Sequence, residues 1–120
     1  MRDYFDESEF PKCNPPCKKT DMDTDFMRML NNAREYAGVP FILLSAYRAR
    51  KHELDQGRDG TSSHTKGVAV DIQAVNSRMR YKIIYGLIRA GFNRIGVGRG
   101  FIHADRDTAK PDSVIWHYYP

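Results

Sequence analysis

The sequence predicts a small α+β domain in which two main helices pack against a mostly antiparallel sheet. Two segments with helical spacing of apolar residues each end at a glycine, Gly38 and Gly91. Short apolar or alternating segments of strand length lie between and after them. This mixture of two helices and several short strands is typical of an α+β domain.

The chain is long enough to form one domain with its own core. It has 120 residues, and no repeat, low-complexity tract or linker divides it. We therefore expect a single domain over residues 1–120, beginning with an irregular arm over residues 1–20. Three apolar side chains are available to hold this arm, namely Tyr4, Phe5 and Phe10.

The first helix is predicted from about Asp23 to Ala37. Acidic residues crowd its first turn, and Gly38 supplies the stop. Its apolar residues recur at helical spacing: Phe26, Leu30, Ala33 and Ala37. After it, Pro40 opens a buried strand, FILLSAY, which ends at Arg48.

The centre of the sequence is predicted to be a loop followed by a short strand. The segment 49–63 is polar and contains glycine, as loops do. Strict alternation then predicts a strand over Val68–Ile72. Because side chains alternate along a strand, Val68, Val70 and Ile72 should face one way, and Ala69 and Asp71 the other.

A second helix and three short strands are predicted for the rest of the sequence. The helix runs from about Ser77 to Ala90, is capped by Asn76 or Ser77, and buries Met79, Ile83 and Leu87. The predicted strands are Arg94–Val97, Phe101–Asp105 and Val114–Tyr118. Glycines at 96, 98 and 100 make the first connection between them a tight turn, which indicates a hairpin.

Two histidines and one aspartate form a candidate metal site. His64 precedes Asp71 by seven residues, and His103 shares a strand face with Phe101 and Asp105. If the two strands pair, Asp71 and His103 lie side by side, with His64 reaching in from the adjoining loop. Two imidazoles and a carboxylate are a common ligand set for catalytic zinc.

Taken singly, each of these residues also has an ordinary structural interpretation, as a satisfied core or surface histidine or as a capping aspartate. The complete pattern Ser-x-His-x-x-Gly-x-Ala-x-Asp, from Ser62 to Asp71, is far more restrictive. Gly67 lets the backbone turn tightly into the strand, and Ala69 leaves room beside the carboxylate.

The net charge indicates which classes of partner are favoured. A net charge of +4 and a pI near 9.2 favour acidic partners, among them nucleic acid, anionic lipid and cell-wall polymers. The charges are scattered, which favours a solvated basic surface over a nucleic-acid site. No apolar run reaches the roughly 20 residues that span a bilayer.

The two cysteines have several possible states. Cys13 and Cys17 allow a disulfide, half of a second metal site or free thiols, and we expect a local structural role.

The order of these motifs resembles the zinc D-Ala-D-Ala carboxypeptidases and their relatives of the hedgehog/DD-peptidase fold, which include D-Ala-D-Ala dipeptidases and phage endolysins. The resemblance covers nearly the whole chain: EF before the cysteine pair, VPFILLSAYR, SSHTKGVAVDI, GFNRIGVGRGFIHADRD and the terminal WHYY. It implies that His64, Asp71 and His103 are zinc ligands. It also implies that Arg48 binds the substrate near the scissile carbonyl.

The resemblance leaves the general base open. Many relatives carry an acidic residue a few positions before the last histidine ligand, and residues 97–102 contain none; others carry a histidine two positions before it, where this chain has Phe101. Asp105 is the first candidate, because residues two apart on one strand face lie roughly 6–7 Å from each other. As a base, Asp105→Ala would keep the metal and lose turnover. The alternative is a carboxylate that orients a ligand histidine.

His117 is the second candidate, as a base or as a donor to the oxyanion. Its neighbours Trp116 and Tyr118 either cap the core or line the cleft.

The predicted function is zinc-dependent hydrolysis of peptide bonds in bacterial peptidoglycan stem peptides, of the D-Ala-D-Ala carboxypeptidase or endopeptidase type. A small basic domain of this kind suggests a monomeric phage endolysin, made in the cytoplasm without a signal peptide and acting on the cell wall after release. The alternative is a non-catalytic zinc domain that binds cell-wall peptides or a protein partner.

Overall fold

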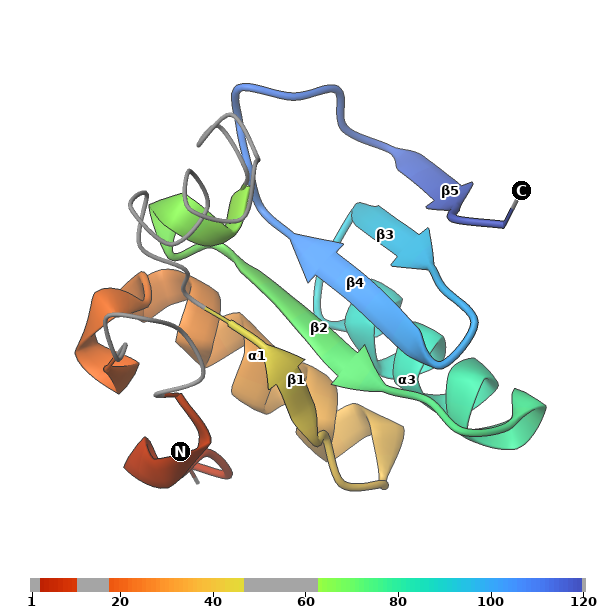
Figure 1. The fold of residues 1–120 in the computed structure, drawn as a ribbon, viewed down its shortest axis with the longest axis horizontal. Helices are drawn as coiled ribbons and strands as arrows, with labels where there is room; N and C mark the ends of the chain where they lie inside the picture. Colours follow the sequence, from red (N-terminus) through yellow and green to blue (C-terminus); the bar gives the residue numbers. More distant parts are fainter. Residues whose placement is uncertain (1–2, 11–17, 47–62, 120) are drawn as a thin grey trace.

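The computed structural model describes residues 3–10, 18–46 and 63–119. Within them, two helices lie behind one face of a five-stranded sheet (Figure 1), whose strand order is β1-β2-β4-β3-β5. The predicted α+β class is confirmed. In chain order the elements are η1 (Glu7–Glu9), η2 (Lys19–Asp21), α1 (Thr24–Ala37), β1 (Leu43–Ser45), η3 (Ser63–Lys66), β2 (Ala69–Gln73), α3 (Ser77–Arg89), β3 (Arg94–Val97), β4 (Phe101–Asp105) and β5 (Val114–His117).

Both helices begin and end where the sequence predicts, within a residue. The Asp23 side chain caps α1 by accepting from the Phe26 backbone N–H at 2.8 Å, and Gly38 ends that helix in a left-handed conformation. Asn76 caps α3 in the same way, accepting from the Met79 N–H at 2.9 Å. The predicted apolar stripes enter the shared core, except that Met79 is only partly buried.

The sheet is mostly antiparallel, as predicted. β2 pairs with β1 and β4, and β3 and β4 form the predicted hairpin, all antiparallel. β5 is the exception, because it pairs with β3 in parallel. β1 begins two residues after the predicted start at Phe41, and its register with β2 shifts between Leu43 and Ser45. The end of the predicted strand, from residue 47 on, lies outside the described residues. β5 formally ends at His117, but the Tyr118 N–H still donates to Val97 O at 3.0 Å.

The described part of the N-terminal arm packs against the core as expected. Phe5 and Phe10 are buried, and the Tyr4 backbone N–H donates to Asn31 Oδ1 at 2.7 Å. Cys13, Cys17 and most of the predicted loop 49–63 lie outside the described residues. No helix within the described ranges is both long and apolar enough to cross a bilayer.

Gly67, just before β2, packs against the segment 21–23 that leads into α1, and we expect it to tolerate no side chain. Its φ is +72°, and a Cβ there would lie 2.4 Å from Asp21 O. Its own carbonyl accepts from the Asp23 N–H at 2.8 Å. Gly67→Ala should therefore lower the free energy of unfolding by about 2 kcal/mol or more, measured by urea denaturation.

Gly100→Ala is the matched control, because a Cβ there would meet nothing within 4 Å. It should change the free energy of unfolding by no more than about 0.5 kcal/mol. Equal effects of the two substitutions would show that the contact between Gly67 and the segment 21–23 contributes nothing to stability.

Candidate metal centre

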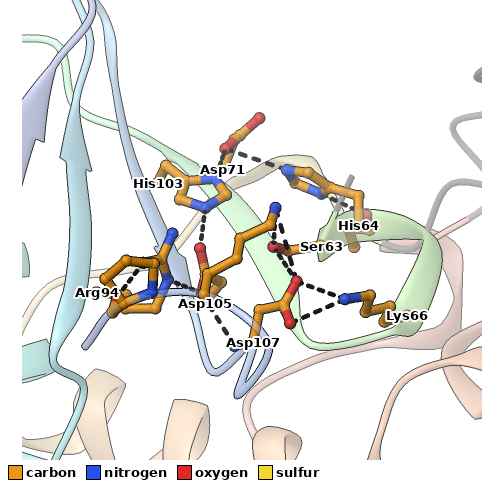
Figure 2. Close-up of polar contacts among 11 residues, drawn as sticks. Ser63, His64, Lys66, Asp71, Arg94, His103, Asp105 and Asp107 are labelled. Carbon is orange, nitrogen blue, oxygen red and sulfur yellow. Dashed lines mark hydrogen bonds and ion pairs between the residues drawn. The ribbon is translucent and has the colours of Figure 1, made fainter. Parts of the chain in front are cut away.

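The register of β2 and β4 places Asp71 directly opposite His103. Both side chains emerge on the sheet face away from the helices, because Val70, Ile72 and Ile102 fill the core on the other face. His64 joins them from η3, the short turn that leads into β2. Figure 2 shows the three side chains converging, with Asp71 between the two imidazoles.

The three side chains meet at distances that suit a metal ion. Asp71 Oδ1 lies 2.9 Å from His103 Nδ1 and 3.5 Å from His64 Nε2. One ligand atom from each residue lies within 4.8 Å of the other two. Ligand atoms that bind one zinc ion at 2.0–2.2 Å lie less than 4.8 Å apart, so the spacing of these three atoms is compatible with one shared ion. The described residues can therefore hold a metal here.

The remaining nitrogen of each imidazole is held by an oxygen acceptor. His64 Nδ1 lies 2.7 Å from Ala46 O, and His103 Nε2 lies 2.7 Å from Asp105 Oδ2. Metal-ligating histidines usually donate their other N–H to a carbonyl or carboxylate, which fixes the tautomer and the ring orientation. With a metal ion bound, His64 Nε2 and His103 Nδ1 would therefore be the nitrogens that face the ion beside Asp71.

The electrostatics of the trio favour an ionised carboxylate. Burial opposes ionisation of Asp71, but hydrogen bonds from His103 and His64 outweigh it and hold its pKa below the usual range. Burial likewise disfavours protonated His103, yet the Asp105 and Asp71 carboxylates raise its pKa. Protons and a metal ion would therefore compete for His103.

Asp105 is engaged on both oxygens and is 1% exposed. Oδ2 faces His103, while Oδ1 accepts from Arg94 Nε at 2.6 Å and from the Asp107 N–H at 3.0 Å. Arg94 also donates to Pro111 O, and its guanidinium lies 5.0 Å from the Trp116 ring centroid. Asp105 therefore lies between a candidate ligand and a buried arginine, with almost none of its surface exposed.

A cavity of about 260 Å³ opens over the trio. Trp116 and Tyr118 line it, and the Trp116 ring centroid lies 5.5 Å from that of His103. Gly96 makes this contact possible, since a Cβ there would lie 2.8 Å from the Trp116 ring. The residues lining the cavity are Ser63, His64, Asp71, Arg94, Phe101, His103, Asp105, Lys110, Trp116 and Tyr118.

The predicted site residue His117 does not join this group. His117 is exposed and does not line the cavity, because it alternates along β5 with Trp116 and Tyr118, which do. Its ring contacts Tyr119 instead. Arg48 lies outside the described residues.

Three cavity residues were not anticipated from the sequence. Arg94 carried a weak signal, as an arginine that opens an otherwise apolar strand, RIGV. Ser63 and Lys110 carried none, because Lys110 comes from the irregular connection between β4 and β5 and only the fold brings it to η3.

Comparison with known families agrees with this geometry. A family model described as Peptidase M15 matches residues 3–105, a range that includes all three candidate ligands. The chain belongs to the peptidase M15 family. This is the family of zinc D-Ala-D-Ala carboxypeptidases, so the resemblance drawn from the sequence motifs is confirmed. No curated protein matches the chain.

Membership of the M15 family supports a metallopeptidase that acts on a peptide substrate. Peptidases of this family depend on a metal, and His64, Asp71 and His103 are able to bind one.

A second buried carboxylate, Asp107, ties η3 to the segment after β4. Lys66 Nζ lies 2.9 and 3.0 Å from its two oxygens, and Ser63 Oγ donates to Oδ2 at 2.8 Å. Burial opposes ionisation of Asp107, but these hydrogen bonds and the Ala109 N–H hold its pKa at about 2. We call Ser63, Lys66, Asp107 and Lys110 the Asp107 cluster; Figure 2 shows its first three members below the metal trio.

Asp107→Asn should lower stability at neutral pH by about 2 kcal/mol. The folded pKa of about 2 is below the reference value of 3.8, so the carboxylate stabilises the fold fully above pH 4. That contribution is lost as the pH falls through 2. The difference in free energy of unfolding between wild type and variant should therefore shrink between pH 4 and pH 2, measured by urea denaturation.

Asp112→Asn is the control, because it removes an exposed carboxylate from the same segment. It should stay within about 0.5 kcal/mol of wild type at every pH. A constant Asp107→Asn deficit from pH 7 to pH 2 would contradict the assignment of an ionised, stabilising Asp107.

Proposed function

We propose that the chain is a zinc-dependent peptidase that hydrolyses peptide bonds in the stem peptides of bacterial peptidoglycan, as a D-Ala-D-Ala carboxypeptidase or endopeptidase. The observation that carries this proposal is the convergence of His64, Asp71 and His103, each imidazole held by an acceptor on its second nitrogen. Nitrogen and carboxylate ligands in a three-residue set are typical of catalytic zinc, which keeps a fourth position open.

Bound zinc would supply a Lewis acid that activates water and polarises the scissile carbonyl near neutral pH. The protein residues do the rest. His64, Asp71 and His103 hold the ion, and the cavity walls of Trp116 and Tyr118 confine the peptide beside it. Arg48, by resemblance to the family, would bind the substrate near the scissile carbonyl.

Asp105 has a positioning role in this proposal. Its bond to His103 Nε2 is 2.7 Å, and its other oxygen is already taken by Arg94 and the Asp107 N–H. A carboxylate bound in this way holds the His103 ring and increases the basicity of its metal-facing nitrogen. Of the two roles considered for Asp105, orientation of a ligand fits these contacts better than transfer of the water proton.

The same contacts are also compatible with a second function, that of a non-catalytic zinc domain that binds cell-wall peptides or a protein partner. Among the described cavity residues, Asp71 is a candidate ligand and Asp105 is fully engaged. Neither is a free carboxylate poised as a general base. A domain without such a base would retain the metal and bind peptide without cleaving it.

The biological setting is a further part of the proposal. A small basic peptidase domain suits a monomeric phage endolysin that is made in the cytoplasm and reaches the cell wall after release. The net charge of +4 would favour approach to the acidic polymers of that wall.

Digestion of purified peptidoglycan tests the proposal. Zinc-loaded protein should release new amines, and mass spectrometry of the fragments identifies the bond that is cut. Chelation should stop the release, and added zinc should restore it. Release that survives chelation would exclude a metal mechanism, and binding without release would favour the non-catalytic domain.

A further inference from the structure

The Asp107 cluster places a cation at the edge of the candidate metal centre. Ser63, which precedes the candidate ligand His64, accepts a hydrogen bond from Lys110 Nζ at 2.9 Å. Lys110 lines the same cavity as the metal trio, whereas Lys66 does not. The two lysines therefore have different positions relative to the substrate space, although both approach Asp107.

Lys66 is the closer of the two ion-pair partners of Asp107. Its ammonium contacts both carboxylate oxygens, at 2.9 and 3.0 Å, while Lys110 Nζ stays 3.6 Å from the nearer one. The second distance exceeds a normal hydrogen bond. One carboxylate and two ammonium groups leave one positive charge in the cluster, and it lies on the lysine that faces the cavity.

Lys110 has donors to spare for a ligand. An ammonium group carries three N–H donors, and within the described residues one of them is used on Ser63. The Lys110 side chain is 37% exposed, so solvent and ligands can reach it. Arg94, the second lysine or arginine among the described cavity residues, is bound to Asp105.

We propose that Lys110 binds a carboxylate of the substrate peptide and so selects peptides that carry a free carboxylate near the scissile bond. This inference rests on the proposed peptidase function. Stem peptides offer two sources of this group, the C-terminal carboxylate and the internal isoglutamate carboxylate. Ser63 fixes the ammonium at the rim of the cavity, and Asp107 and Lys66 hold Ser63 in place.

The test compares zinc-loaded wild type with Lys110→Met on a lysine-type stem pentapeptide ending in D-Ala-D-Ala. Three modified peptides accompany it: the C-terminal amide, the internal isoglutamine form and the doubly amidated form. On the free-acid peptide, Lys110→Met should raise KM by about 10- to 100-fold with kcat nearly unchanged, because a charged hydrogen bond to the bound peptide is lost. The zinc content should not change.

The amidated peptides identify the carboxylate. If the KM difference disappears on the C-terminal amide, Lys110 binds the terminal carboxylate; if it disappears on the isoglutamine form, Lys110 binds the internal one. A difference that persists on the doubly amidated peptide, or no difference on any peptide, would overturn the inference.

Two further variants serve as controls for a folding defect and for the general loss of a positive charge. Lys110→Arg keeps the charge and should retain a KM within a few fold of wild type. Lys82→Met removes an exposed cation from α3, outside the cavity, and should match wild type throughout.

Calorimetric titration of the same peptides separates this inference from the proposed function. If wild type cleaves none of them, the peptidase proposal fails, but weaker binding of the free-acid peptide by Lys110→Met still supports the carboxylate site. Equal dissociation constants for the two proteins would exclude that site whether or not any peptide is cleaved.

Discussion

Replacing His103 with alanine is expected to remove both the bound zinc and the peptidase activity. His103 Nδ1 lies 2.9 Å from Asp71 Oδ1, and alanine would leave two of the three candidate ligands found among the described residues. Loss of a residue that merely orients a ligand costs about 10- to 100-fold in metal affinity or activity. Loss of the ligand itself should cost more, measured as zinc content after dialysis and as release of stem-peptide fragments.

His117→Ala is the matched comparison, because it removes an imidazole from an exposed position that does not line the cavity. It should retain zinc and turnover close to wild type. A His103→Ala protein that keeps one zinc ion per chain would contradict the ligand assignment. Loss of turnover in His117→Ala with zinc retained would instead revive His117 as the base.

The juxtaposition of the metal trio could be predicted because strand geometry is local. Alternation places His103 and Asp105 on one face of their strand whatever the rest of the chain does. The hydrophobic pattern of Val70, Ile72 and Ile102 then fixes that face away from the core, and a register slip of one residue would bury the charged set. The helices could be predicted for a similar reason, since their caps lie in the adjacent sequence.

The parts that were not predicted depend on contacts distant in sequence. No local pattern reports that β5 runs parallel to β3, because an irregular connection separates it from β4. The sequence therefore did not show whether Trp116 or His117 on β5 faces the metal trio. Lys110 reaches Ser63 across 47 positions of sequence, a distance over which residue type alone predicts nothing.

Asp105→Asn should weaken zinc binding by about 10- to 100-fold while leaving substantial turnover at saturating zinc. Asparagine keeps an oxygen that can accept from His103 Nε2, but it lacks the charge that raises the pKa of His103 and strengthens its second nitrogen as a ligand. It also leaves Arg94 without its ion-pair partner, so some loss of stability is expected. Zinc titration followed by activity at each zinc concentration separates affinity from turnover.

The two roles of Asp105 predict opposite results in this experiment. A general base would leave zinc affinity intact, and no excess of zinc would restore the lost turnover. A positioning carboxylate would give an activity deficit that closes as the zinc concentration rises. The contacts favour the second result, because Asp105 is 1% exposed and already engaged by His103, Arg94 and the backbone. Full zinc affinity with no turnover would return Asp105 to the role of base, and the buried network around it would then have to open during the reaction.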